Sequence, residues 1–292
     1  MEQSKKRNKR LWKRLCTAVI VFFCVLGCLV LWNEGTERQV YVKPDYEKKS
    51  IGHLLDKEIL EDTDYKLLFL QTGLGRTAVD FLRINNRQQE LEELQDLFFA
   101  EVEVKCKANT IVTREERIAE VKLPIKDRGR VDIPYLEKGD ILITFNCHAL
   151  GWRNGHAAMV VDAEERLAVE ARMLGTDSSI GSMAHWERYP SFAVLRLNGI
   201  SKEQREKIAD YAAENLVDVP YRLESGIWER IWKNEKEEAL TGTHCAHLIW
   251  YAYQNFGYDL DSDGGIVVTP RDLYESPLLE IIQIYGMPYR NY

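Results

Sequence analysis

The sequence predicts an α+β fold, because segments typical of strands and segments typical of helices are segregated along the chain. Between residues 139 and 197, short apolar segments are separated by polar turns, as in an antiparallel sheet. After residue 200, residues 201–216 and 246–256 have the length and spacing of helices. The chain has 292 residues, of which 45% are hydrophobic, so it is long enough to bury a core.

The predicted sheet is made from four segments. A turn at Gly139 precedes the apolar strand 141–145. Residues 156–161 and 167–171 flank a short acidic turn and form a predicted hairpin. Residues 192–197 are a further strand, and the short connections favour antiparallel neighbours.

The predicted helices have recognisable ends. Ser201 begins the first helix, with Glu203 and Gln204 near its start. The second helix ends at Gly257, a common C-terminal stop. Thr269 and Pro270 begin a third helix, because proline is favoured in the first turn.

Residues 53–130 are predicted to form a helical subdomain that packs against a domain of residues 131–292. Apolar residues recur at helical spacing as far as Val104, with a break at Gly73. Residues 33–52 are polar and aperiodic, so we expect a tether there.

The N-terminal residues predict a membrane anchor. Residues 1–14 contain seven Lys or Arg side chains and one acid, and residues 15–32 carry no charge. An apolar run of this length is near the minimum for a transmembrane helix. By the positive-inside rule, the basic tail stays in the cytoplasm and the chain after Trp32 is exported. The predicted localisation is therefore the cell membrane, with a single span.

Two alternatives give the same export. The apolar run could belong to a cleaved signal peptide. Residues 25–28 also loosely match the cleavage box of a bacterial lipoprotein, which would place a lipid anchor on Cys28. Because the run stays apolar as far as Trp32, the transmembrane anchor is favoured over both.

The charge distribution excludes a nucleic-acid-binding role. The formal net charge is −7, and outside residues 1–14 the chain has 32 basic and 45 acidic residues. Binding to phosphates needs a basic surface instead. The six cysteines do not form a disulfide framework either, since three lie in the apolar run and Cys106, Cys147 and Cys245 are widely spaced.

Cys245 and His156 are the residues best placed for chemistry. Cys245 begins an apolar helix, where the helix dipole and unpaired backbone N–H groups favour the thiolate. The same N–H groups are candidate oxyanion donors. His156 begins a strand directly after Gly155, where its side chain can project from the sheet edge and act as a base.

Glu170, on the partner strand of the hairpin, is the candidate that orients His156. A hairpin loop of three or five residues places residues 156 and 170 opposite each other on one face of the sheet. A loop of four residues would turn Glu170 to the other face, and the orienting role would then need another residue.

Two metal-binding alternatives have incomplete motifs. Six side chains are potential zinc ligands, but neither HExxH nor a paired CxxC occurs; they are Cys147, His148, His156, His244, Cys245 and His247. An acidic stretch matches the start of an EF-hand loop, but Pro270 stands where the bidentate Glu belongs; its residues are Asp259, Asp261, Asp263 and Gly264. We therefore expect no metal.

The order of the motifs resembles a known family. Cell-wall peptidases of the NlpC type carry a Pro-Tyr pair and a Cys-led helix, then a Gly-Asp strand and a Gly-His strand. Here the order is swapped: Gly139-Asp140, Gly155-His156, Val169-Glu170-Ala171, Pro220-Tyr221 and His244-Cys245. Over about residues 135–285, the sequence therefore resembles the circularly permuted branch of this papain-like fold, the YiiX/YebB-like cysteine hydrolases.

The resemblance implies that Cys245 is the nucleophile, His156 the general base and Glu170 the polar third member. It also implies that Tyr221 lies near the site and lines the substrate cleft, with a core aromatic role as the alternative. One departure is Ala246, because family members usually have Ser after the cysteine.

The implied chemistry is acyl transfer through a covalent intermediate, without a metal or organic cofactor. Family substrates range from peptidoglycan stem peptides to lipid acyl groups, and an exported, anchored domain favours the peptide amide. Two non-enzymatic alternatives are a catalytically silent module that binds cell wall or lipid, and an interaction protein whose partner binds residues 54–104.

Overall fold

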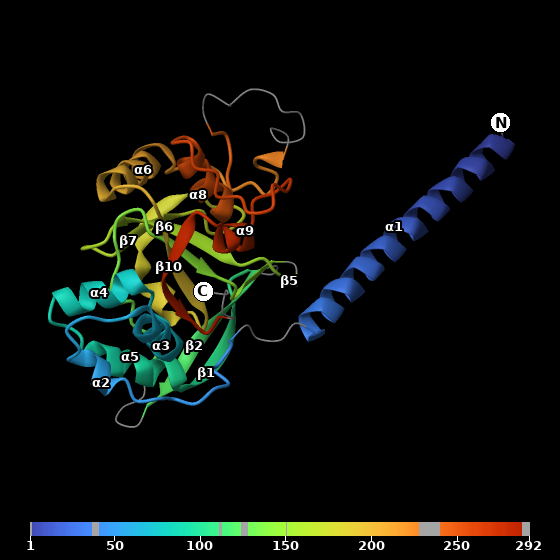
Figure 1. Cartoon of the computed structure of the whole chain (residues 1–292). Coiled ribbons are helices and arrows are strands. Elements are labelled where there is room, and N and C mark those ends of the chain that lie inside the picture. The colour runs from blue at the N-terminus through green and yellow to red at the C-terminus, as the bar shows by residue number, and fades with distance from the viewer. Residues whose placement is uncertain are drawn as a thin grey trace.

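The computed structural model describes residues 2–36, 41–110, 113–123, 128–149, 151–227 and 240–287. In this part of the chain, helices cover both faces of a six-stranded sheet, and a long helix stands apart from the body (Figure 1). All of the paired strands are antiparallel, so the predicted α+β fold with an antiparallel sheet is confirmed.

The six-stranded sheet contains all four predicted strand segments. Its central strands are short and aliphatic, and they are buried on both faces because helices cover them from each side. The order across the sheet is β10 (Leu279–Tyr285), β9 (Phe192–Leu197), β3 (Ile141–Thr144), β6 (His156–Asp162), β7 (Leu167–Glu170) and β8 (Ser179–Ser182).

One face of the sheet is covered by α6 (Lys202–Asn215), α8 (Cys245–Gln254) and α9 (Pro270–Glu275), which are the three predicted helices. Ser201 and Thr269 are the N-cap residues of α6 and α9, so both helices begin where the sequence predicts. Ser201 and Gln204 make a capping box at α6, and Thr269 makes one at α9 with Pro270 in its first turn. These caps fix where each helix begins and therefore where Cys245 meets the sheet.

The other face carries a helical layer and a short 3-10 helix, η1 (Met183–Arg188). Gly75 makes the close contact between this layer and the sheet, because a Cβ atom there would lie only 1.8 Å from the Ile281 carbonyl oxygen. The helices of the layer are α2 (Gly52–Leu55), α3 (Asp62–Thr72), α4 (Arg76–Ile84) and α5 (Glu90–Phe99).

The expectation of a purely helical region over residues 53–130 is wrong after Phe99. β1 (Glu101–Ala108) and β2 (Thr113–Lys122) form a second sheet with β4 (Cys147–Ala149) and β5 (Trp152–Arg153). The segment 101–105 alternates acidic or basic residues with Val102 and Val104, and this two-residue period suits a strand that is exposed on one side. Val102 also continues the four-residue spacing of Leu94 and Phe98, which is why the helical pattern extends past Phe99 in the sequence.

The described part of the expected tether, residues 41–52, lies against the body. The Val42 N–H donates to the Gly286 carbonyl over 2.9 Å, and the Tyr46 hydroxyl donates to the Leu70 carbonyl over 2.6 Å. Ile51 is buried in the core of the helical layer. Polar groups in this stretch therefore attach it to the body by hydrogen bonds. A hydropathy pattern does not distinguish such groups from the polar residues of a free linker.

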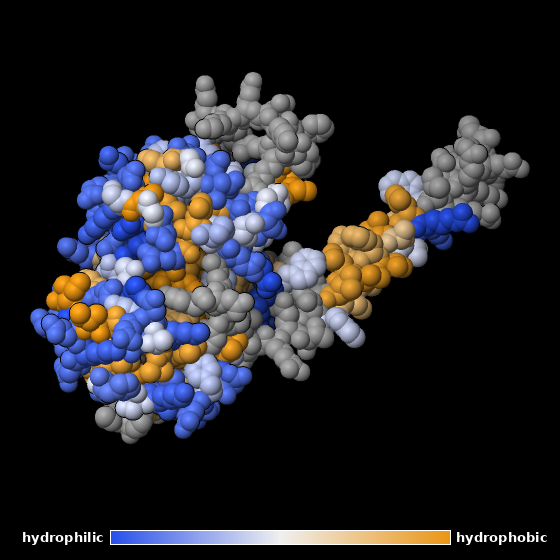
Figure 2. All heavy atoms as spheres, in the orientation of Figure 1, coloured by the Kyte–Doolittle hydropathy of each residue, from blue (hydrophilic) through white to orange (hydrophobic). Residues whose placement is uncertain are grey.

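The N-terminal helix α1 spans Glu2–Thr36, longer at both ends than the predicted anchor. Its stretch Trp12–Leu29 is long and apolar enough to cross a membrane, and such a stretch near an N-terminus fits either a single span or a signal sequence. Figure 2 shows most of this stretch as a hydrophobic band, with a small hydrophilic patch on its side away from the body.

A buried ion pair ties β9 to the turn before β3. Arg196 donates from Nε to Asp140 Oδ1 over 2.7 Å and from Nη2 to Asp140 Oδ2 over 2.8 Å, and the Asp140 side chain is fully buried. The Arg196→Met variant would leave this carboxylate without its partner. We expect the free energy of unfolding to fall by about 3 to 5 kcal/mol, measured by urea unfolding of the full chain in detergent.

The matched control is Lys207→Gln, which removes an exposed cation from α6. Its unfolding midpoint should stay within experimental error of the wild type. An Arg196→Met variant as stable as this control would contradict the role given to the ion pair.

Candidate active site

The side chain of Cys245 lies at the first residue of α8. His244 is the N-cap residue, with an extended backbone, and its side chain accepts a hydrogen bond from the His247 N–H over 3.4 Å. The cap ends the preceding extended segment and exposes the first N–H groups of α8 beside the thiol. Cys245 is only 4% exposed, so little solvent screens it from these groups.

His156 and Glu170 contact each other on the predicted hairpin. His156 Nε2 lies 2.7 Å from Glu170 Oε2, and both side chains are buried. Gly155 places His156 at the start of β6. Its φ is +73°, and a Cβ atom there would lie 2.7 Å from the Thr144 carbonyl oxygen, so this position admits only glycine.

The contact between His156 and Glu170 depends on the loop length of the hairpin and on an irregularity in β6. Asp162 pairs with Leu167, so the loop has four residues, the length that should turn Glu170 to the other face. The strand register then shifts between Val160 and Asp162, which makes Val161 an extra residue on β6. This β-bulge shifts by one residue the alternation of β6 side chains between the two faces of the sheet. His156 and Glu170 therefore lie on the same face.

Two neighbours of His156 were not predicted. The Trp186 ring stacks on the His156 ring, with centroids 5.4 Å apart and planes inclined by 14°. His185 Nε2 lies 3.3 Å from Glu170 Oε2, so Glu170 is shared by two imidazoles. Both residues belong to η1, and only their contacts through the fold identify them, because no motif surrounds them in the sequence.

The pKa values of the three groups are coupled by hydrogen bonds and charge. Burial raises the pKa of the Cys245 thiol, but hydrogen bonds and charges from His156 and His244 outweigh it and lower the pKa to about 6. Burial lowers the pKa of His156, but its hydrogen bonds to Cys245 and Glu170 raise it to about 9. Although burial opposes it, contact with both imidazoles holds the pKa of Glu170 well below its usual value.

These pKa values favour a thiolate facing an imidazolium near neutral pH, with Glu170 ionised behind the imidazolium. Since Nε2 of His156 binds Glu170, Nδ1 is the ring nitrogen left for the thiol. The group can therefore supply a nucleophile and a proton donor together.

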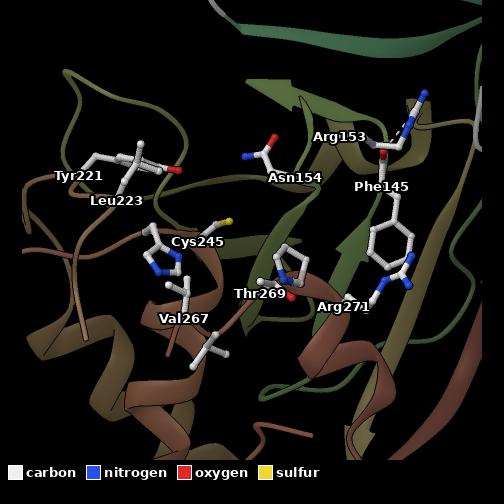
Figure 3. Close-up of a pocket in the computed structure, with 12 residues that line it drawn as sticks. Phe145, Arg153, Asn154, Tyr221, Leu223, Cys245, Val267, Thr269 and Arg271 are labelled. Carbon is white, nitrogen blue, oxygen red and sulfur yellow. Dashed lines mark hydrogen bonds between the residues drawn. The ribbon is translucent and has the colours of Figure 1, made fainter. Parts of the chain in front are cut away.

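Two cavities flank Cys245, with volumes of about 380 and 340 Å³, the size of small-ligand sites. Asn154, Tyr221, Leu223 and Cys245 line both cavities. In Figure 3, the Tyr221 hydroxyl points toward Cys245 from one side, while Asn154 lies above the thiol. Tyr221 therefore borders the cleft, and burial together with the nearby thiolate raises the pKa of its hydroxyl.

Cys147 lines the second cavity, but the pKa of its thiol is shifted in the opposite direction from that of Cys245. Its Sγ lies 3.4 Å from the Tyr189 hydroxyl. Burial raises the pKa of the Cys147 thiol to about 12, which leaves it protonated at neutral pH. Of the two cysteines that line the cavities, Cys245 therefore has a lowered thiol pKa and Cys147 a raised one.

In the described part of the chain, no three of the six potential zinc ligands place their ligand atoms within 4.8 Å of one another. Among the residues that the structure describes, the group of three or more His, Cys, Asp or Glu ligand atoms within 4.8 Å of one another is Asp261, Asp263 and Asp272. Asp272 closes the capping box of α9, and the oxygens of Asp261 and Asp263 accept backbone hydrogen bonds in a turn. The carboxylates of this acidic stretch therefore stabilise a turn and cap a helix.

Comparisons with known proteins find two similar chains. No protein-family model matches. The uncharacterized protein YycO of Bacillus subtilis is 26% identical over 151 residues, which are 51% of this chain and 56% of YycO, so the chain spans little more than half of that relative. The crystal structure of the metalloprotein YiiX from Escherichia coli O157:H7 is similar over 52% of this chain and 98% of YiiX, with a TM-score of 0.38 and 16% identity.

Replacement of Glu170 by glutamine is expected to lower kcat/KM for a thioester substrate by about 10²-fold, because the charge that supports the His156 imidazolium is removed. Glu164→Gln, in the exposed turn of the same hairpin, is the control and should keep wild-type turnover. Turnover by Glu170→Gln within twofold of that control, roughly the scatter of such measurements, would contradict the role of Glu170.

Proposed function

We propose that this protein is a membrane-anchored cysteine hydrolase that cleaves an amide outside the cytoplasm. The observation that carries the proposal is the thiol of Cys245, with its lowered pKa, between two cavities and against His156. Glu170 holds the other side of the imidazole. A nucleophile, a proton donor and an orienting carboxylate in one cleft form the arrangement of a covalent acyl-transfer site.

In the proposed reaction, Cys245 Sγ attacks the carbonyl carbon, a C–S bond forms, and the carbonyl electrons move to oxygen. Backbone N–H groups at the start of α8 are the candidate donors to that oxyanion. Collapse of the intermediate breaks the C–N bond, and the leaving amine takes the proton of His156. His156 then takes a proton from water, the hydroxide attacks the acyl carbon, and the C–S bond breaks to restore the thiolate.

The proposed substrate is a peptide amide, such as the stem peptide of peptidoglycan. Support comes from the apolar N-terminal stretch Trp12–Leu29 and the basic tail before it, which together would place the body on the outer side of the membrane. The competing candidates are a lipid acyl hydrolase or acyltransferase of the same fold and a catalytically silent binding module.

Product analysis separates these candidates. The full chain in detergent, as wild type and as Cys245→Ala, is incubated with muropeptides, phospholipids and simple thioesters. We expect new termini from muropeptides with the wild type only. Fatty acid release would identify the lipid enzyme, and no Cys245-dependent product from any substrate would identify the silent module.

The anchoring is tested on the same chain expressed in a bacterial host. We expect it to sediment with membranes, to resist a high-salt wash, and to be released by detergent. Its intact mass distinguishes the alternatives: the full sequence mass supports the transmembrane anchor, a shortened chain indicates signal cleavage, and a lipid-modified chain that begins at Cys28 indicates a lipoprotein.

A further inference from the structure

The residue before the proposed nucleophile, His244, carries a buried imidazole. His244 is 6% exposed and lines the 380 Å³ cavity together with Cys245. In Figure 3, the Cys245 thiol points into this cavity, with Tyr221 and Leu223 on one side and Thr269 on the other. An imidazole in this wall can meet a substrate whose carbonyl group reaches the thiol.

One nitrogen of the His244 ring is occupied by the cap of α8. His244 Nδ1 accepts a hydrogen bond from the His247 N–H over 3.4 Å. An acceptor nitrogen must present a lone pair, so the ring proton that goes with this cap is on Nε2. The hydrogen bond at one ring nitrogen therefore makes the other ring nitrogen a donor.

That second nitrogen, Nε2, is a donor with an open position. It is buried, and it makes no hydrogen bond of normal length and angle with any residue that the structure describes. Burial raises the pKa of the Cys245 thiol, and His244 is second to His156 among the groups that lower it, so the ring lies beside the sulfur. A buried donor without an acceptor costs stability, and a ligand in the cavity can supply the missing acceptor.

Backbone hydrogen bonds fix the position of His244. The Thr243 N–H donates to the Pro220 carbonyl over 2.9 Å, and the Arg222 N–H donates to the Thr243 carbonyl over 2.8 Å. The backbone at His244 is extended, with φ −124° and ψ 172°, and α8 begins at the next residue. The imidazole is therefore in place before a substrate binds, as electrostatic stabilisation of a transition state requires.

We propose that His244 is a further catalytic residue, whose Nε2–H donates a hydrogen bond to the carbonyl oxygen of the substrate as that oxygen becomes an oxyanion. This inference rests on the proposed function and adds a side-chain donor to the backbone N–H groups of Cys245 and Ala246, which the cap does not use.

The proposed hydrogen bond is strongest when the oxygen carries charge. When Cys245 Sγ bonds the carbonyl carbon, the carbonyl electron pair moves to oxygen, and Nε2–H binds that charge without transferring its proton. The pair returns to the carbon–oxygen bond as the leaving group departs. An interaction that strengthens in this way lowers the barrier and not only the dissociation constant of the substrate.

Two substitutions at His244 separate the donor from the cap. Asparagine places its carboxamide near the position of Nδ1, so His244→Asn keeps the cap and loses the donor. Glutamine places an amide nitrogen near the position of Nε2, so His244→Gln keeps a donor and loses the cap. Because asparagine is a favoured N-cap residue and glutamine is not, His244→Asn should have the higher urea unfolding midpoint of the two.

The first readout is the initial rate at which phenyl thioacetate acylates the full chain in detergent, followed as released thiophenol. We expect His244→Asn to lower this rate by about 10²-fold and His244→Gln to stay within about tenfold of wild type, the reverse of their order in stability. His53→Asn makes the same change at an exposed histidine of α2, outside both cavities, and should keep the wild-type rate. A wild-type rate in His244→Asn, or a rate in His244→Gln no higher than in His244→Asn, would overturn the inference.

A second reagent separates the oxyanion from the effect of His244 on thiol ionisation. Methyl methanethiosulfonate transfers a methylthio group to the same thiolate and releases methanesulfinate, without forming an oxyanion at carbon. For His244→Asn we expect the rate of this transfer at Cys245 to fall much less than the acylation rate. Equal losses with both reagents would overturn the inference, because the side chain would then act only through the thiol. Acylation that persists in Cys245→Ala would instead overturn the proposed function.

Discussion

The Cys245→Ala variant is expected to lose turnover by roughly 10⁴-fold or more, because it removes the sulfur atom of the proposed nucleophile. The Cys245 side chain is buried beside the sheet, and alanine fits the same space without adding a polar group. The measurement is the rate of thiol release from a thioester, together with a circular dichroism spectrum to verify the fold.

Cys106→Ala is the matched control, since Cys106 is exposed on β1 and lines neither cavity. It should turn over the thioester at the wild-type rate. Turnover that persists in Cys245→Ala at the level of this control would assign the nucleophile to another residue.

The His156→Gln variant is expected to raise the pKa of the Cys245 thiol from about 6 to above its ordinary value. Burial alone raises this pKa, and the hydrogen bond and charge of His156 are the first of the contributions that lower it. At pH 7 the wild-type thiol is ionised, whereas the variant thiol would be protonated. We expect turnover to fall by about 10³-fold, since the proton donor is lost as well.

The control for this variant is a substitution of Trp186, the residue that stacks on the His156 ring. Trp186 stacks on His156 but carries no charge, so Trp186→Phe should change the thiol pKa much less than His156→Gln does. An unchanged thiol pKa in His156→Gln would show that His244 or the helix terminus, and not the His156 imidazole, controls ionisation.

Local patterns were sufficient to predict the parts of the fold that depend on neighbours in sequence. The caps at Ser201 and Thr269 lie within four residues of their partners, and the hairpin around residues 156–170 is also local. The contact between His156 and Glu170 was predicted only conditionally, because it depends on loop length. The β-bulge at Val161 has no signature in the sequence, so the four-residue loop alone would have given the wrong face.

Features that depend on distant contacts could not be predicted. The sequence favours a helix at the start of β1 because Val102 continues the four-residue spacing of Leu94 and Phe98, whereas Val102 and Val104 together fit a strand. Only the pairing partners decide between the two patterns. His185 and Trp186 reach the site through η1. The arginines that line the two cavities come from distant elements: Arg114 from β2, Arg153 from β5, Arg172 from the segment after β7 and Arg271 from α9. The overall acidic composition concealed that cationic lining, since composition averages over buried pairs and over opposite surfaces.

The central claim is that the Cys245 thiol is ionised at neutral pH by its partner His156. Its most direct test is the rate of iodoacetamide alkylation at each cysteine of the full chain between pH 4 and 10, quantified by mass spectrometry of peptides. We predict that the Cys245 rate rises with a midpoint near pH 6, while Cys147 stays unreactive through neutral pH because its pKa is raised to about 12. A Cys245 midpoint at or above that of an ordinary thiol, about pH 8.5, would contradict the account.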